Sequence, residues 1–227
     1  LEEQLGKLNI SFLNQKNFIN YKIKNNYINF FNQDSKNSYF NLSGSINFKP
    51  FFFDLVVDLK SIKLKEIENF LYNIYKNRNL EFENLSGVLM INLKNIENKL
   101  FDSGYLNLKV ENSKLNIDDN IFNINDFASL VISDYEYLEN DNQILQMKIK
   151  VNVKNLEKLN RFLFSYQRDK IKSKEIFITY QYNNNDSSSY ISQISNKGFY
   201  NNPELYGFRN IQQLKNLFKD KNFFNLD

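Results

Sequence analysis

The sequence predicts a mainly β protein: a long, twisted antiparallel sheet with two or three short amphipathic helices. Apolar and polar residues alternate along most of the chain, which is the period of a strand with one apolar and one solvated face. Short polar turns rich in Asn and Asp join the alternating runs, and short connections favour antiparallel neighbours. We count about ten such runs. No break in composition divides the chain, so we expect a single module over residues 1–227.

The first expected strands lie before residue 32. Leu8, Ile10 and Phe12 alternate with polar residues and predict one strand. Residues 18–31 predict one or two more, with a hairpin turn at Asn25-Asn26, because Asn tolerates the left-handed conformation that tight turns need.

The clearest strands lie on either side of Pro50. Apolar residues occupy one parity from 40 to 48 and again from 53 to 59, and polar residues occupy the other, with Val56 the one exception. Pro50 lies between them, where its missing N–H does least harm to a sheet. The same alternation returns along most of the chain and gives an extended apolar surface, in which we look for function rather than in a reactive site.

A change of period predicts a helix over about 63–79. Leu64, Ile67, Leu71 and Ile74 recur at spacings of three and four, with charged residues on the remaining faces. Ser61 is placed to cap this helix, although the start could lie two residues later.

The second half of the chain repeats the alternating style. Turns are expected at 118–120 and 139–142, and a polar loop at 183–189. Helices are expected at about 155–167 and 208–220, with frayed residues after 222. The expected strands are 87–94, 104–111, 115–117, 122–127, 130–137, 145–154 and 176–182.

Composition excludes several function classes. The chain has no Cys and no His, which removes disulfides, zinc thiolates and the commonest general base, and we expect no metal and no cofactor. The net charge of +3 comes from 29 basic and 26 acidic residues that are interspersed, so we expect no nucleic-acid partner. With 22 Phe and 14 Tyr the chain can bury a sizeable core. Asn falls on polar strand positions and in turns, which favours an AT-rich genome over a prion-like segment.

The candidate catalytic and metal-binding groupings have simpler explanations. Asp54 and Asp58 share a strand face, but four residues of strand separate them by about 13 Å, beyond the roughly 5 to 9.5 Å that glycoside hydrolysis uses. Ser187-Ser188-Ser189 has no His partner. We therefore expect no enzyme. Five residues resemble a calcium loop without its Gly or terminal Glu and are interpreted as a turn: Asp118, Asn120, Asn123, Asn125 and Asp126.

Two segments resemble the AsmA-like family of bacterial envelope proteins. One runs from Gly44 through Pro50 to Phe53 as GSINFKPFFF and continues as VDLKSIKL from Val57 to Leu64. In the family, a strand of this kind ends in a bend, and a "D-L-K" strand leads into a short helix. The other runs from Val153 to Lys172, where a long strand enters a short helix and Arg168 precedes further strands. The resemblance covers about residues 40 to 210.

The resemblance implies a long sheet curled into an open groove with apolar residues inside, and no catalytic residues. It implies a periplasmic protein that carries phospholipid acyl chains between inner and outer membrane and supports outer-membrane biogenesis, with an outer-membrane protein as a possible partner. The segment begins without Met and has no signal-peptide pattern, so we expect it to be part of a longer chain, anchored to the inner membrane by a segment outside it.

Strand parity nominates the residues that would line the groove. The alternative is that the same face packs against helices or a second sheet as an ordinary core, as in a structural or adhesive β-sandwich without a lipid ligand. The expected lining residues are Phe40, Leu42, Ile46, Phe48, Leu55, Val57, Leu59, Leu89, Ile91, Leu93, Leu106, Leu108, Met147, Ile149, Val151 and Val153.

Overall fold

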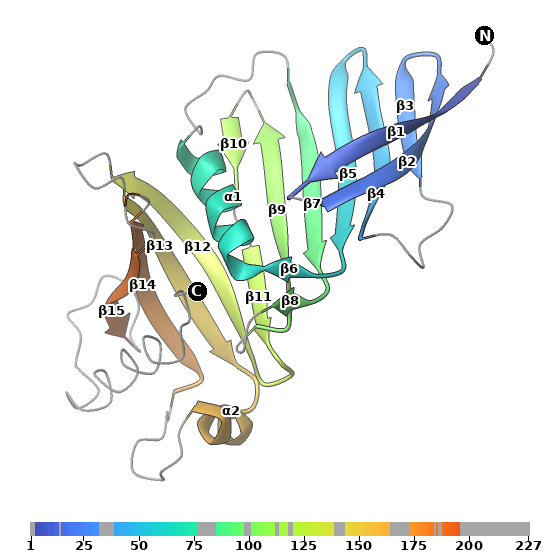
Figure 1. Cartoon of the computed structure of the whole chain (residues 1–227). Helices are drawn as coiled ribbons and strands as arrows, with labels where there is room; N and C mark the ends of the chain where they lie inside the picture. Colours follow the sequence, from blue (N-terminus) through green and yellow to red (C-terminus); the bar gives the residue numbers. More distant parts are fainter. Residues whose placement is uncertain are drawn as a thin grey trace. The chain divides into compact units, whose positions relative to one another are not determined.

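The computed structural model describes residues 3–13, 15–31, 39–76, 85–97, 101–111, 114–117, 120–138, 144–163, 173–183, 185 and 188–195. These residues form a mainly β protein with two helices, as the sequence predicts (Figure 1). The chain divides into two compact units. Unit 1 comprises Leu1–Glu97 and Ser103–Asp118, and unit 2 comprises Asn98–Asp102 and Asp119–Asp227.

The first five strands of unit 1 are hydrogen-bonded neighbours in chain order, and each is antiparallel to the next. Asn25 has a φ of 54° in the turn between the second and third strands, which confirms the predicted hairpin. Pro50 lies between the fourth and fifth strands and follows a cis peptide bond. The strands are β1 (Gln4–Phe12), β2 (Gln15–Lys24), β3 (Tyr27–Phe31), β4 (Phe40–Phe48) and β5 (Phe51–Leu59).

The next strand corrects the expectation of a purely antiparallel sheet. β7 (Gly87–Leu93) pairs with β5 in parallel, and the small strands β6 (Ile62–Lys63) and β8 (Ile96–Glu97) also pair in parallel. The chain between β5 and β7 contains a helix, and such a crossover returns the chain to the end of the sheet from which a parallel strand must start. β9 (Ser103–Glu111) and β10 (Lys114–Asn116) then continue the antiparallel order. The sheet of unit 1 is therefore mixed.

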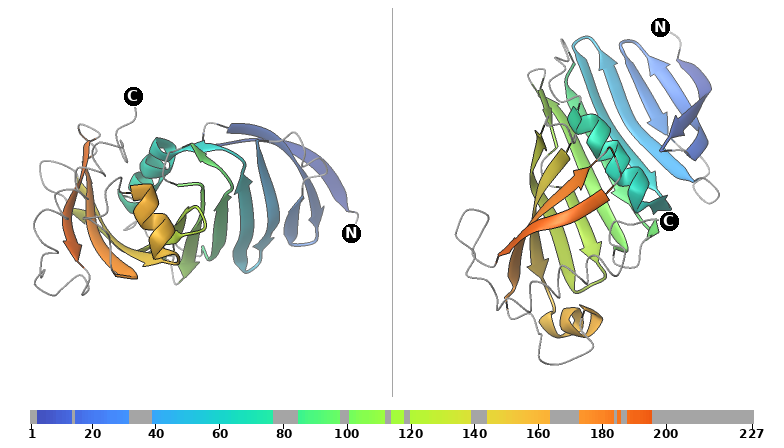
Figure 2. Two further views of the ribbon diagram at one scale, coloured as in Figure 1. Left: turned by 90° about the horizontal axis from the view of Figure 1, so that it is seen from below. Right: turned by 60° about the vertical axis from the view of Figure 1, so that its left-hand side comes forward.

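The crossover helix α1 (Leu64–Lys76) lies on one face of the sheet of unit 1 (Figures 1 and 2). It begins at Leu64, where the Lys63 N–H donates to the Glu66 carboxylate at 3.3 Å, a contact that satisfies an otherwise unpaired donor of the first turn. Ser61 is not the cap, because the helix begins three residues after it; its hydroxyl donates to Glu97 at 2.6 Å. The predicted apolar stripe is buried at Leu64, Ile67 and Leu71.

Unit 2 contains five strands that are antiparallel neighbours in chain order. Asn120 was expected in a turn, but it begins the first of them and is buried there. The last strand begins at residue 188, inside the range 183–189 that was predicted as a loop. α2 (Leu156–Leu163) confirms the second predicted helix, while the helix expected at 208–220 lies outside the described residues. The strands are β11 (Asn120–Ile124), β12 (Ala128–Leu138), β13 (Ile144–Val153), β14 (Glu175–Asn183) and β15 (Ser188–Ser195).

Candidate functional site

The candidate site in unit 1 is the apolar face of β4, β5, β7 and β9. Strand register places eleven of the expected lining residues, together with Gly44, Phe53, Gly87 and Val110, in four rows across the sheet. Each row runs perpendicular to the strands, because directly opposed residues share a face. The rows are Phe40 with Leu59 and Leu93; Leu42 with Val57, Ile91 and Leu106; Gly44 with Leu55, Leu89 and Leu108; and Ile46 with Phe53, Gly87 and Val110.

Burial falls from the first row to the fourth along β4 and β5, and at Leu89 of β7, whereas Leu108 and Val110 of β9 stay buried in the third and fourth rows. The first two rows are fully buried, and Leu59 and Ile91 are 0% exposed. In the third and fourth rows Leu55, Leu89 and Ile46 are only half-buried. Phe48, one step further along β4, is 44% exposed. The apolar face therefore has a covered end and an open end.

Two aromatic contacts cover the buried end. The ring of Phe12, at the end of β1, lies 5.7 Å from that of Phe70 on α1 and 6.4 Å from that of Phe40. The Asn17 side chain donates to the Phe40 carbonyl. The β1–β2 hairpin and α1 thus meet over the first row, on the same face of the sheet (Figure 2).

Two glycines allow close packing within the third and fourth rows. Gly44 has a φ of 121°, and a Cβ there would lie 2.0 Å from the Asp54 carbonyl oxygen. Gly87 has a φ of 152°, and the Phe53 ring lies where its Cβ would be, at 2.5 Å. Both positions require glycine because other residues rarely adopt this backbone and would clash with the neighbouring strand.

The expected lining residues of unit 2 lie on one face of β13. Met147, Ile149, Val151 and Val153 are all buried. Their cross-strand neighbours on β12 and β14 are also buried, among them Tyr135 and Tyr180 beside Met147. This face shows no gradient of the kind found in unit 1.

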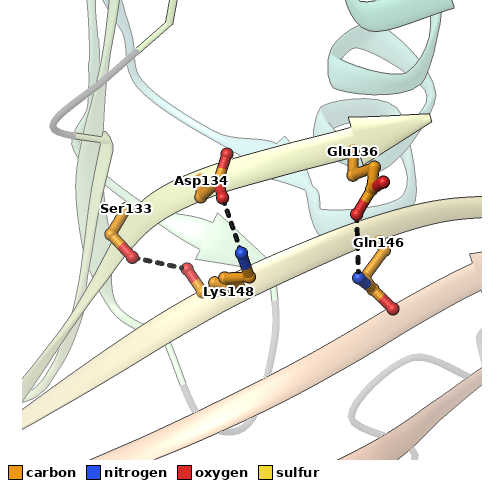
Figure 3. Close-up of polar contacts among 5 residues, drawn as sticks. All are labelled: Ser133, Asp134, Glu136, Gln146 and Lys148. Atoms are coloured by element: carbon orange, nitrogen blue, oxygen red, sulfur yellow. Dashed lines mark hydrogen bonds and ion pairs between the residues drawn. The ribbon is translucent and has the colours of Figure 1, made fainter. Parts of the chain in front are cut away.

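Polar side chains pair with one another on the opposite face of unit 2 (Figure 3). Lys148 contacts Asp134 at 2.8 Å, and its carbonyl accepts a bond from the Ser133 hydroxyl at 3.2 Å. Gln146 donates to Glu136 at 3.3 Å and accepts from Gln181 at 2.6 Å. Such contacts between neighbouring strands stabilise a sheet, and they give the carboxylates of Asp134 and Glu136 a partner each, Lys148 and Gln146.

Asp58 and Asp54 lie on the polar face of β5, away from the apolar rows. Burial opposes ionisation of Asp58, but hydrogen bonds from Asn92 at 2.8 Å and Lys94 at 3.0 Å, together with the Lys94 charge, lower the pKa of Asp58 below its ordinary value. Asp58 is therefore engaged in a structural network rather than paired with Asp54 for catalysis.

Among the described residues no three His, Cys, Asp or Glu side chains gather as a metal site. Of the calcium-like grouping, Asn120 and Asn123 lie in β11, and Asn125 and Asp126 form the following turn. Asp126 pairs with Lys158 at 2.5 Å. Asp118 lies outside the described residues.

Sequence reasoning overlooked several residues of the apolar faces. Phe53 and Val110 share the fourth row with Ile46. On β3, Ile28 extends this row beyond β4, and Phe30 extends the third row. Phe53 has the same parity as Leu55, so the alternation itself could have identified it. Tyr135 could not be found this way, because the register of β12 shifts between Ile132 and Asp134.

No family model, curated protein or solved structure matches this chain. In the described part of the chain, neither helix has the length and hydropathy needed to cross a bilayer.

Proposed function

We propose that this chain is a non-enzymatic envelope protein of the AsmA-like type, whose apolar sheet face binds phospholipid acyl chains and conducts them between inner and outer membrane. The observation that carries the proposal is the burial gradient of unit 1. Leu55, Leu89 and Ile46 are half-buried apolar side chains in the two adjacent rows beyond the covered end. An acyl chain lying across these rows would remove them from water.

Energetics support an acyl chain as the ligand. Burial of a methylene group is worth about 0.8 kcal/mol, so a chain of roughly sixteen carbons gains on the order of 10 kcal/mol by leaving water. This free energy is close to what the acyl chain gains by entering a bilayer. A conduit should bind the chain about as strongly as the membrane does, because tighter binding would stall transfer. The four rows contain no charged residue, so no buried charge opposes the chain.

The proposed setting is the periplasm, in support of outer-membrane biogenesis. Attachment to the inner membrane would come from a segment outside this chain, and an outer-membrane protein would be a partner. The proposed mechanism uses no cofactor, since taking up and releasing an acyl chain requires no bond to be made or broken.

Native mass spectrometry of the chain purified without detergent tests the proposal. Phospholipid adducts should accompany the folded protein, and a fluorescent fatty acid should displace them. A folded protein that carries no phospholipid and takes up no fatty acid would contradict it.

A structural or adhesive interaction domain is the second candidate. The uniform burial of Met147, Ile149, Val151 and Val153 favours it for unit 2, since such a face has the burial of an ordinary core. Under this alternative no part of the chain would bind lipid. Photo-crosslinking by a phospholipid with a reactive acyl chain separates the two candidates, because labelled peptides from β4, β5 or β7 arise only from acyl binding.

A further inference from the structure

The face of β1 and β2 that points away from the core carries exposed apolar and basic residues together. Strand register places Leu5 opposite Lys22, and Asn9 opposite Phe18. Leu5 is 72% exposed and Phe18 66% exposed. Ile19, of the opposite parity, is fully buried, so this hairpin has apolar groups on both of its faces. We define the basic outer face as Leu5, Lys7, Lys16, Phe18, Lys22 and Lys24.

The segment that forms the β1–β2 hairpin carries an excess of positive charge. Residues 3–24 contain four Lys and a single acidic residue, Glu3. Setting these five aside from the 29 basic and 26 acidic residues of the chain leaves 25 of each. With Glu2, which directly precedes this range, the segment still carries four basic and two acidic residues.

Among the residues that the structure describes, a carboxylate pairs with only two of the four lysines. Glu3 pairs with Lys22 at 2.6 Å and with Lys24 at 3.4 Å, and these contacts lower the pKa of Glu3. Lys7 and Lys16 are exposed, and neither has a carboxylate partner among the residues that the structure describes. They flank the position of Phe18 along the hairpin, because Lys7 lies opposite Asn20 and Lys16 opposite Ser11.

From this arrangement we infer that the basic outer face docks onto an anionic bilayer surface, with Leu5 and Phe18 entering the headgroup region and the lysines contacting lipid phosphates. Apolar side chains among lysines on one solvent-facing surface are typical of interfacial membrane binding, because apolar burial and attraction to anionic lipid act together. A nucleic acid would use the charge and the Phe18 ring but would leave Leu5 exposed, since Leu5 has no ring on which a base could stack. The basic outer face is distinct from the apolar face of β4, β5, β7 and β9 that we propose binds acyl chains (the acyl-chain face). The inference does not depend on that proposal.

Co-sedimentation of the full chain with vesicles tests the inference. Vesicles of phosphatidylcholine containing phosphatidylglycerol should bind the protein, and pure phosphatidylcholine vesicles should bind it far more weakly. The double variant Lys7→Gln/Lys16→Gln should weaken binding by roughly fivefold per lysine. The double variant Leu5→Ser/Phe18→Ser should weaken it as well, by removing the inserted groups.

Matched controls alter the same residue types elsewhere. Lys65→Gln/Lys114→Gln removes two exposed lysines, one from α1 and one from β10. Phe52→Ser/Met90→Ser removes two exposed apolar side chains, one from β5 and one from β7. Both should bind as the original chain does. Circular dichroism should show all four variants folded.

Three results would overturn the inference. These are equal binding to both kinds of vesicle, equal losses in the control variants, and binding to a DNA oligonucleotide that competes with vesicles and is unaffected by Leu5→Ser/Phe18→Ser. Fatty-acid uptake by the Lys7→Gln/Lys16→Gln variant reports separately on the acyl-chain face, so failure of one proposal is distinguishable from failure of the other.

Discussion

The side-chain amide of Asn120 donates a hydrogen bond of 2.9 Å to the phenolic oxygen of Tyr135, and both residues are buried in unit 2. Asn120 begins β11, and Tyr135 lies on β12 just beyond its register shift. A polar group buried among apolar side chains needs a partner, so this contact fixes how the two strands meet around the irregularity.

Replacing Tyr135 with Phe should lower the free energy of unfolding by about 1–3 kcal/mol, because it removes the acceptor while keeping the ring. Urea denaturation measures the change. A double-mutant cycle with Asn120→Leu should give a coupling energy of about 1 kcal/mol. Tyr105→Phe, on the half-exposed outer face of β9, is the control and should change stability by less than about 0.5 kcal/mol. A coupling energy of zero would show that the contact contributes nothing.

Alternation predicted most of the strands because it is a local property. It correctly placed Leu42 and Val57 on one face and Asp58 on the other, since period two holds whatever the neighbours are. The parallel pairing of β5 with β7 had no such signal. It depends on where the chain returns after α1, and the residues around Gly87 alternate in the same way as those of an antiparallel strand.

The candidate site was predicted in part for the same reason. Parity placed the expected lining residues of unit 1 on one face, but it could not separate Leu59, which is covered, from Leu55, which is half-buried. That difference arises from the placement of Phe12 and α1 over the first row. Phe12 is far from β5 in sequence, and α1 follows β5 as part of a crossover, so the alternation within β5 carries no signal of either. The basic outer face was missed, although Leu5 and Phe18 both interrupt the polar parity of their strands.

Gly44→Ala should destabilise the chain by about 1–3 kcal/mol, because its φ of 121° is unfavourable for a side chain. The added Cβ would also lie 2.0 Å from the Asp54 carbonyl oxygen. Ser45→Ala, at the next position on β4, has no such conflict and serves as the control. Thermal melts of the two variants measure the difference, and equal melting temperatures would refute the role given to Gly44.

Stability should fall in acid partly through Asp58. Its pKa is lower in the folded chain than its ordinary value of 3.8, so its contribution is present above that value and is lost as pH falls through the folded pKa. Urea denaturation between neutral pH and pH values below 3.8 should show the loss. Asp58→Asn should make the profile flatter in this range.

Lys94→Gln provides the complementary variant. It removes the charge and one hydrogen bond from Asp58 while leaving the Asn92 contact, so it should reduce the acid-dependent loss without abolishing it. If the profiles of the original chain and both variants coincide, the network around Asp58 does not contribute to acid stability.

The burial gradient predicts that two equivalent leucines of β5 respond differently to the same change. Leu55→Asp places a carboxylate at a half-buried position of the third row, where water can still solvate it, so the sheet should stay folded. Leu59→Asp places it in the fully buried first row, where an unpaired charge is costly, and should lower stability by several kcal/mol or prevent folding. Leu108 and Ile149 are buried too, so Asp at either position should behave like Leu59→Asp.

Fatty-acid binding by the folded Leu55→Asp variant then tests the acyl-chain face itself. A charge in the third row should abolish uptake, since the acyl chain would have to lie against it. Asp54→Leu, on the opposite face at the adjacent position, is the control and should leave uptake unchanged because that face meets water. Circular dichroism and thermal melts establish folding before binding is compared. If Leu55→Asp unfolds the chain as Leu59→Asp does, the open end is an ordinary core; if it folds and still takes up fatty acid, the ligand lies elsewhere.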